Sequence, residues 1–238
     1  MKKNIRFVCR SKRCGVNVMI KAAIFDLDGT LLNRDESVKL FINRQYERLN
    51  IFVGHIPKDK YMTRFIELDQ HGYVWKDKVY QQLIEELHIK EITWEELLND
   101  YINEFKHCCV PFPNLTRMLE ELKSRNLILG MITNGYGQFQ FDNIKALDIE
   151  KYFDVILVSE WEGLKKPDPQ LFHRALEKLS ISPNESVFMG DHPENDVKAA
   201  RNLGMKGIWK QNAEHENVVA DFVVDDLMDL PEIIRKAN

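Results

Sequence analysis

The sequence has no long apolar run. Nothing in its 238 residues approaches the roughly 20 consecutive apolar residues of a transmembrane helix. Near the N-terminus, Arg10, Lys12 and Arg13 interrupt any stretch that could form the apolar segment of a secretory signal, about 7–15 residues. Internal repeats and low-complexity segments are also absent from the sequence. We therefore expect a globular protein with no membrane partner.

Cysteine is scarce, with four residues at Cys9, Cys14, Cys108 and Cys109. The adjacent pair cannot easily form a disulfide with each other, and neither a Cys-x-x-Cys motif nor zinc-type histidine spacing is present. This usage predicts reduced cysteines that bind no metal, and hence a cytoplasmic protein.

Acidic residues are missing from the first 18 positions, which carry six basic ones. Without those six, 27 basic residues face 37 acidic ones, so the formal charge changes from −4 for the whole chain to −10. We interpret residues 1–18 as a basic extension outside the core fold, because Met19 opens what resembles a first strand. No recognition helix accompanies the basic segment, so no nucleic-acid partner is expected.

Short runs that are apolar throughout predict strands buried on both faces of a parallel sheet. They occupy residues 22–25, 127–132, 155–158, 186–189, 207–209 and, more weakly, 222–224. Amphipathic segments with helical spacing lie at 115–125, 171–179, 195–203 and 231–236. Alternation of this kind predicts an α/β protein with a doubly wound, Rossmann-like parallel sheet.

Residues 34–110 break the alternation and show helical patterns only. Helices are expected near 38–46, 61–68, 78–87 and 93–105, the last with a capping box between Thr93 and Glu96. We predict an inserted all-helical cap domain at 34–110, with the catalytic core formed by 19–33 and 111–238. Most of its aromatic side chains should pack inward, whereas Arg34 or Arg64 could face a substrate.

Polar residues follow the predicted strands, and the carboxyl ends of parallel strands meet at one edge of a sheet. These residues are Asp26 and Asp28, then Thr133 and Asn134, then Lys165 and Lys166, then Asp191 and Asp196. Four unpaired carboxylates would repel one another, and a divalent cation would relieve that repulsion. Oxygen ligands without Cys or His favour Mg²⁺, while the lysine and the hydroxyl suit phosphate oxygens. One carboxylate could attack phosphorus while a second transfers protons.

Four segments in this order resemble the motifs of the haloacid dehalogenase-like (HAD) hydrolase superfamily, from about residue 20 to the C-terminus. They are Asp26-Leu27-Asp28-Gly29-Thr30, Ile132-Thr133-Asn134-Gly135, Lys166-Pro167-Asp168-Pro169 and Gly190-Asp191 with Asp196. The helical insert is similar to the alpha-helical (C1-type) cap of the first subfamily.

The resemblance implies a role for each matching residue. Asp26 would be the nucleophile and Asp28 the general acid and base, while Thr133 and the Asn134 N–H would hold the phosphoryl group. Lys166 would stabilise the intermediate, with Lys165 the weaker candidate. The implied magnesium ligands are Asp26, the main-chain carbonyl of Asp28, Asp191, and Asp196 as an outer-shell or further ligand.

The function that these roles predict is magnesium-dependent hydrolysis of a small phosphate monoester (a metabolite, nucleotide or sugar phosphate) through an aspartyl-phosphate. A 2-haloacid dehalogenase is the alternative, but its first motif lacks the second acid and it needs no magnesium. A phosphomutase would use the same residues and stays open, as does a monomeric or homodimeric state. A regulatory protein on this scaffold would be expected to have lost Asp26 or Asp28. His192, inside the fourth motif, is expected to position backbone or to be solvated.

Overall fold

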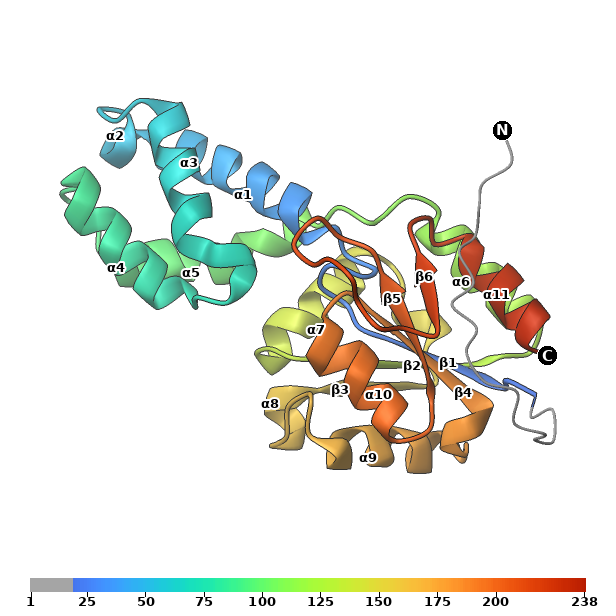
Figure 1. The fold of residues 1–238 in the computed structure, drawn as a ribbon. Helices are drawn as coiled ribbons and strands as arrows, with labels where there is room; N and C mark the ends of the chain where they lie inside the picture. Colours follow the sequence, from blue (N-terminus) through green and yellow to red (C-terminus); the bar gives the residue numbers. More distant parts are fainter. Residues whose placement is uncertain (1–18) are drawn as a thin grey trace. The chain divides into compact units, whose positions relative to one another are not determined.

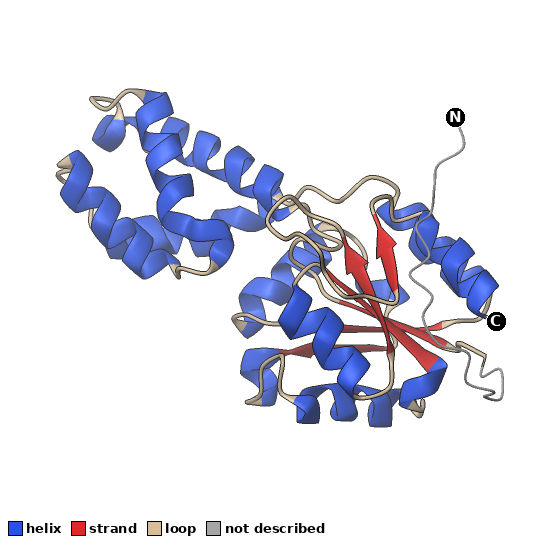
Figure 2. Ribbon diagram, in the orientation of Figure 1, coloured by secondary structure: helices blue, strands red, loops and turns tan. Residues whose placement is uncertain are grey.

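The computed structural model describes residues 19–238, and these residues divide into two compact units (Figure 1). One unit is Asn33–Val110 and contains helices without strands; the other comprises the chain up to Leu32 and Pro111–Asn238 and contains the sheet (Figure 2). The predicted basic extension at 1–18 lies outside the described residues.

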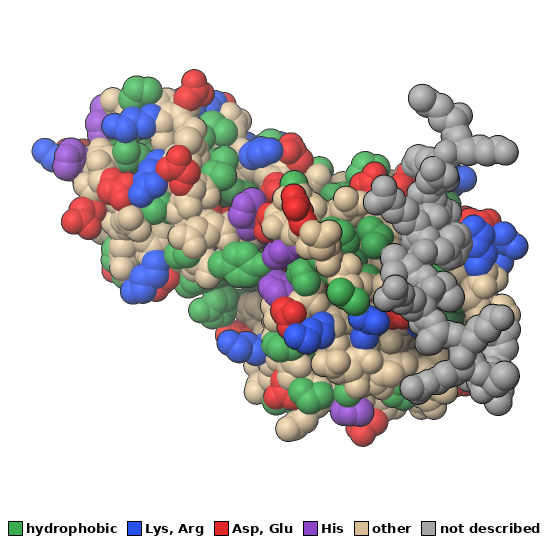
Figure 3. Space-filling view, viewed as in Figure 1, with side chains coloured by type: hydrophobic (Ala, Val, Ile, Leu, Met, Phe, Trp, Pro, Cys, Tyr) green, Lys and Arg blue, Asp and Glu red, His purple; other side chains and the backbone are tan. Residues whose placement is uncertain are grey.

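The surface of the described residues mixes charges of both signs. On the visible face of each unit, Lys and Arg side chains are interspersed with Asp and Glu side chains (Figure 3). Within residues 19–238, no helix combines the length and the apolar character needed to cross a membrane.

Six strands form one sheet in the order β3-β2-β1-β4-β5-β6, and every neighbouring pair is parallel. Their bounds are β1 Ala22–Phe25, β2 Ile128–Thr133, β3 Val155–Val158, β4 Ser186–Gly190, β5 Lys206–Lys210 and β6 Phe222–Val224. The central strand β1 is buried at all four positions, as expected of a strand covered on both faces. The predicted doubly wound parallel sheet is confirmed.

The register of the three central strands places their carboxyl ends at one level. Phe25, the last residue of β1, lies opposite Met131 of β2 and Met189 of β4. The chain order reverses between β1 and β4, which creates the switch point where ligands bind in open parallel sheets. The segments that follow β1, β2 and β4 therefore meet at the centre of this edge.

Helices connect the strands of this unit. They are α6 Leu115–Ser124, α7 Gly137–Ala146, α8 Ser159–Glu162, α9 Pro169–Leu179, α10 Ala199–Asn202 and α11 Asp229–Ala237. The helix predicted at 195–203 is only partly α-helical, because a π-helical turn, Pro193–Lys198, precedes α10. The sequence pattern did not predict α7 or α8.

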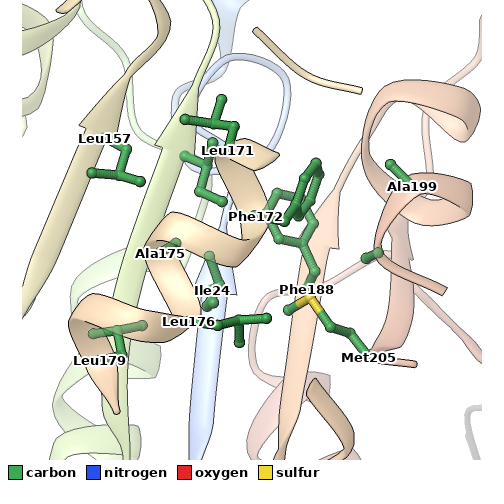
Figure 4. Packing of buried hydrophobic residues seen from close by; sticks show 12 residues of the cluster. Ile24, Leu157, Leu171, Phe172, Ala175, Leu176, Leu179, Phe188, Ala199 and Met205 are labelled. Atoms are coloured by element: carbon green, nitrogen blue, oxygen red, sulfur yellow. The ribbon is translucent and has the colours of Figure 1, made fainter. Parts of the chain in front are cut away.

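The core beneath α9 and α10 joins these helices to four strands. Phe172 of α9 and Phe188 of β4 face each other with ring centroids 5.1 Å apart (Figure 4). Both rings are fully buried, and each contributes roughly 1.5–3 kcal/mol by leaving water. Asp168 begins α9 by accepting a hydrogen bond from the Gln170 N–H, with Pro169 at the first helical position. The loop that ends at Asp168 is thereby anchored to the sheet through α9.

The helical unit contains α1 Arg34–Arg48, α2 Asn50–Val53, α3 Lys58–Asp69, α4 Lys76–Leu87 and α5 Trp94–Glu104. The capping box of Thr93 and Glu96 is present in both directions, as predicted. Most aromatic side chains were expected to pack inward; Phe41, Tyr46, Tyr61, Phe65 and Tyr80 are buried, whereas Tyr73 is 62% exposed and Trp75 is half-buried.

The two arginines considered for substrate contact both bind carboxylates within the helical unit. Arg34 forms two hydrogen bonds with Asp69, at 2.8 and 3.0 Å, and Lys76 pairs with the same buried carboxylate. Arg64 pairs with Glu86 and Glu67 on the surface. These contacts assign both arginines a structural partner.

Candidate active site

The structure brings the sequence-predicted site residues to the carboxyl edge of the sheet. Asp26 directly follows β1, and its N–H continues the sheet by donating to the Met189 carbonyl at 2.9 Å. Thr133 is the last residue of β2, and Asp191 directly follows β4. Lys166 reaches the same edge from the loop between α8 and α9.

Lys166 is the central cation of the site. Its Nζ lies 2.7 Å from Asp26 Oδ1 and 2.7 Å from Asp196 Oδ1, and the residue is only 4% exposed. Burial is the largest single influence and lowers the pKa of Lys166, but Asp196 and Asp26 together outweigh it and the pKa is raised. The neighbouring Lys165 is exposed. Of these two lysines, Lys166 alone forms ion pairs with the buried carboxylates.

Three carboxylates crowd around this lysine. Asp26, Asp191 and Asp196 each offer an oxygen within 4.8 Å of the others. Burial, with the repulsion of Asp196 and Asp28, raises the pKa of Asp26 to about 7 although Lys166 lowers it. Burial and the charges of Asp26 and Asp196 raise the pKa of Asp191 well above its ordinary value. The cluster is short of positive charge, and its all-oxygen donor set fits Mg²⁺.

Two glycines allow the carboxylates to converge. A Cβ on Gly29 would lie 2.2 Å from Asp191 Oδ2, and the φ of +74° at Gly29 disfavours other residues. A Cβ on Gly190 would lie 2.4 Å from the Asp196 side chain. Side chains at either position would push a carboxylate out of the cluster.

The segments after β2 and β3 are joined by side-chain hydrogen bonds. Asn134 holds the main chain of Lys166 from both sides: its Oδ1 accepts from the Lys166 N–H at 2.8 Å and its Nδ2 donates to the Lys166 carbonyl at 3.0 Å. Ser159 Oγ accepts from the Gly135 N–H at 2.9 Å, and Glu160 accepts from the Gly137 N–H at 2.7 Å. The backbone that carries Lys166 is therefore fixed to the Thr133 loop.

Asp28 is connected to Thr133 by Gln140, a residue that the sequence analysis did not identify. Gln140 of α7 is buried, and its Nε2 lies 2.6 Å from Asp28 Oδ2 and 3.0 Å from Thr133 Oγ1. Two further missed residues hold Asp191, whose carbonyl accepts from Trp209 Nε1 at 2.9 Å and from Asn212 Nδ2 at 3.3 Å. No motif spacing marks these residues, because they come from elements that only the fold brings together.

His192 acts on backbone, as the sequence analysis expected. Its Nδ1 accepts hydrogen bonds from the N–H groups of Glu194 and Asn195, both at 3.1 Å, and so begins the π-helical turn. Asp196 adds to this turn, because its Oδ2 accepts from the His192 N–H at 3.0 Å. The turn holds Asp196 against Lys166.

The raised pKa of Asp26 predicts how stability depends on pH without metal. Between pH 4 and 7 the folded protein keeps the Asp26 proton, whereas the unfolded chain, with an ordinary pKa of 3.8, loses it. The free energy of unfolding should therefore fall as pH rises through this range. Asp26→Asn cannot ionise, so its stability relative to the wild type should rise by roughly 2–4 kcal/mol from pH 4.5 to pH 8. Urea unfolding in EDTA measures this difference, and a difference independent of pH would contradict the prediction.

Known proteins are similar to this chain in sequence and in fold. The family model for haloacid dehalogenase-like hydrolases matches residues 23–210. A glyceraldehyde 3-phosphate phosphatase of Methanothermobacter thermautotrophicus is 34% identical over 235 residues, covering 91% of this chain and all of that protein. The magnesium-bound crystal structure of the HAD-hydrolase YfnB from Bacillus subtilis has the same fold, with a TM-score of 0.73, 21% identity and coverage of 91% and 99%. A 2-haloacid dehalogenase from Pseudomonas syringae is also similar, with a TM-score of 0.61, 25% identity and coverage of 92% and 100%. The chain belongs to the haloacid dehalogenase-like hydrolase family.

Proposed function

We propose that this protein is a magnesium-dependent phosphatase that hydrolyses a small phosphate monoester through an aspartyl-phosphate on Asp26. The observation that carries the proposal is the buried Asp26 carboxylate, held at 2.7 Å by Lys166 and grouped with Asp191 and Asp196. The 34% identical phosphatase supports the reaction class. The residues of the site supply each part of the chemistry.

In the first step a carboxylate oxygen of Asp26 attacks phosphorus, and the bond from phosphorus to the leaving oxygen breaks. Asp28 gives its proton to that oxygen, so that an alcohol departs. In the second step Asp28 takes a proton from water as the water attacks the aspartyl-phosphate, which releases phosphate and restores Asp26. The Thr133 hydroxyl and the Asn134 N–H would bind the phosphoryl oxygens, and Lys166 would offset their charge.

The residues that would hold Mg²⁺ are the carboxylates of Asp26, Asp191 and Asp196, together with the main-chain carbonyl of Asp28. When bound, the ion offsets the repulsion between the anionic nucleophile and the anionic substrate. The raised pKa of Asp26 fits this assignment, because the protein alone leaves its carboxylates under-compensated.

We also propose that residues 34–110 act as the cap that selects the leaving group and excludes water, with 19–33 and 111–238 as the catalytic core. The division of the chain at Asn33 and Val110 is compatible with this assignment. The partner is then a small phosphorylated molecule. A cytoplasmic location and a monomeric or homodimeric state stay predictions.

The dehalogenase alternative shares the fold, so the choice depends on the site residues. A dehalogenase has no use for an acid two residues after its nucleophile, whereas here Asp28 is present and hydrogen-bonded to Gln140. It also has no use for a carboxylate cluster that suits Mg²⁺, which Asp191 and Asp196 provide. These residues favour the phosphatase.

Assays of the purified chain test the proposal. With a panel of phosphate monoesters and Mg²⁺ we expect release of inorganic phosphate, and EDTA should lower the rate at least about 100-fold, because charge neutralisation supplies much of the acceleration. Adding Mg²⁺ in excess should restore the rate. Activity that is indifferent to chelation would contradict the metal requirement. Chloride release from 2-chloropropionate would instead support the dehalogenase, and an isomerised product without free phosphate would support the mutase.

A further inference from the structure

Gln140 connects the proposed acid to the phosphate loop. Its Nε2 lies 2.6 Å from Asp28 Oδ2, 3.0 Å from Thr133 Oγ1 and 3.0 Å from the Asn134 carbonyl. The residue is 2% exposed and lies on α7, 112 positions from Asp28 in the sequence. Packing of α7 against the sheet alone would not require three polar contacts from one amide nitrogen.

The orientation of the Gln140 amide is fixed by its other side. Gln140 Oε1 accepts a hydrogen bond from Asn143 Nδ2 at 3.3 Å. A flipped amide would place two N–H donors against each other at Asn143 and two oxygens against each other at Asp28. The amide nitrogen therefore faces Asp28, Thr133 and the Asn134 carbonyl.

Gln140 Nε2 carries two hydrogens, and their distribution among the neighbouring oxygens determines which of these oxygens act as acceptors. Two N–H groups serve three oxygens, so Asp28 Oδ2 at the shortest distance takes one and the Thr133 and Asn134 oxygens share the other. When Asp28 is protonated, its Oδ2 still accepts from Gln140, and the proton therefore resides on Oδ1. The Thr133 oxygen likewise accepts from Gln140, which leaves its own hydrogen for another acceptor.

We propose that Gln140 is a positioning residue that fixes which oxygen of Asp28 carries the transferable proton. The inference rests on the proposed function, in which the proton on Asp28 Oδ1 passes to the leaving oxygen as the phosphorus–oxygen bond breaks. An acid that rotates freely offers its proton in the right direction only part of the time.

Two substrates that share a phosphoryl group but differ in leaving group isolate this role. The alkoxide of benzyl phosphate leaves only with a proton, whereas the nitrophenolate of 4-nitrophenyl phosphate leaves without one. In Gln140→Met we expect kcat/KM for benzyl phosphate to fall on the order of 10- to 100-fold more than kcat/KM for 4-nitrophenyl phosphate. Loss of the Thr133 contact affects both substrates alike and cancels in this ratio.

A second readout follows hydrolysis of the aspartyl-phosphate, in which Asp28 acts as the base that takes a proton from water. With 4-nitrophenyl phosphate, Gln140→Met should release a rapid burst of nitrophenol followed by a slow steady state, because water attack on the intermediate still needs an oriented base. Gln140→Glu keeps the shape but places an oxygen against Asp28, so it should show the same change in ratio if the Met variant folds poorly. Gln138→Met is the matched control, because Gln138 is exposed on the same helix and hydrogen-bonds to Asp142.

Three outcomes of these measurements support or overturn the positioning role of Gln140. A changed ratio with a burst supports the positioning role. Equal losses for both substrates in the Met and Glu variants would overturn it, because a merely structural residue affects both reactions alike. A wild-type chain that hydrolyses neither these two substrates nor any other phosphate monoester of the panel would contradict the proposed function itself, and the role of Gln140 with it.

Discussion

Replacing Asp26 by Asn should reduce kcat/KM for phosphate monoesters on the order of 10⁴-fold or more, because a neutral amide cannot attack phosphorus. The geometry of the site should survive the change. Asn Oδ1 can still accept from Lys166, which keeps its second partner Asp196 at 2.7 Å. The loss would therefore report chemistry and not unfolding.

Steady-state assays with Mg²⁺ measure the loss, and rapid acid quenching with labelled substrate measures the intermediate. The wild type should carry label on Asp26, whereas the Asn variant should carry none. Asp148→Asn is a matched control, since Asp148 is exposed and Asn also tolerates its φ of +55°. Wild-type turnover in the Asp26 variant would rule out Asp26 as the nucleophile.

Much of the fold follows from patterns that are local in sequence. Each strand contains a short apolar run, and the predicted bounds 22–25, 155–158 and 222–224 agree with the structure. Parallel connection then places the residue after each strand at one edge, so that Asp26 and Asp191 could be grouped before any coordinates. Predicting that the Asp26 and Asp191 side chains lie close together therefore required no information about long-range contacts.

Helix α7 could not be predicted from the spacing of apolar residues. Its buried positions are Gly137, Gln140, Asn143 and Ile144, so three of the four carry no apolar side chain and the usual helical spacing of apolar residues is missing. The polar face is buried because Gln140 hydrogen-bonds to Asp28 and Thr133. Hydrogen bonds to the candidate site here replace the usual apolar contacts, so the hydrophobic pattern is missing.

Contacts between separate loops were also beyond prediction. Asn134 was expected to serve the phosphoryl group through its N–H, and no role was predicted for its side chain, yet the side-chain amide fixes the backbone of Lys166. The predicted helix around Asp196 instead begins with a π-helical turn, a conformation that often occurs at functional sites. Such details depend on distances between chain segments that no spacing in the sequence encodes.

At pH 9, where the raised pKa of about 7 leaves Asp26 ionised in the wild type, replacing Lys166 by Met should destabilise the metal-free protein by about 3–5 kcal/mol, because the buried Asp26 and Asp196 lose their shared cation. Met preserves much of the volume and length of the side chain, so packing against Phe188 should largely remain. Added Mg²⁺ should recover part of the lost stability if it binds the same carboxylates. Urea unfolding with EDTA and with Mg²⁺ measures both effects.

Lys165→Met is the matched control, since Lys165 is exposed and should leave stability within about 0.5 kcal/mol of the wild type. A double variant separates the charge effect from packing. Asp26→Asn in the Lys166→Met background removes one of the two stranded carboxylates and should restore roughly 1–3 kcal/mol in the absence of metal. If Lys166→Met were as stable as Lys165→Met, the ion pairs would not hold the cluster together.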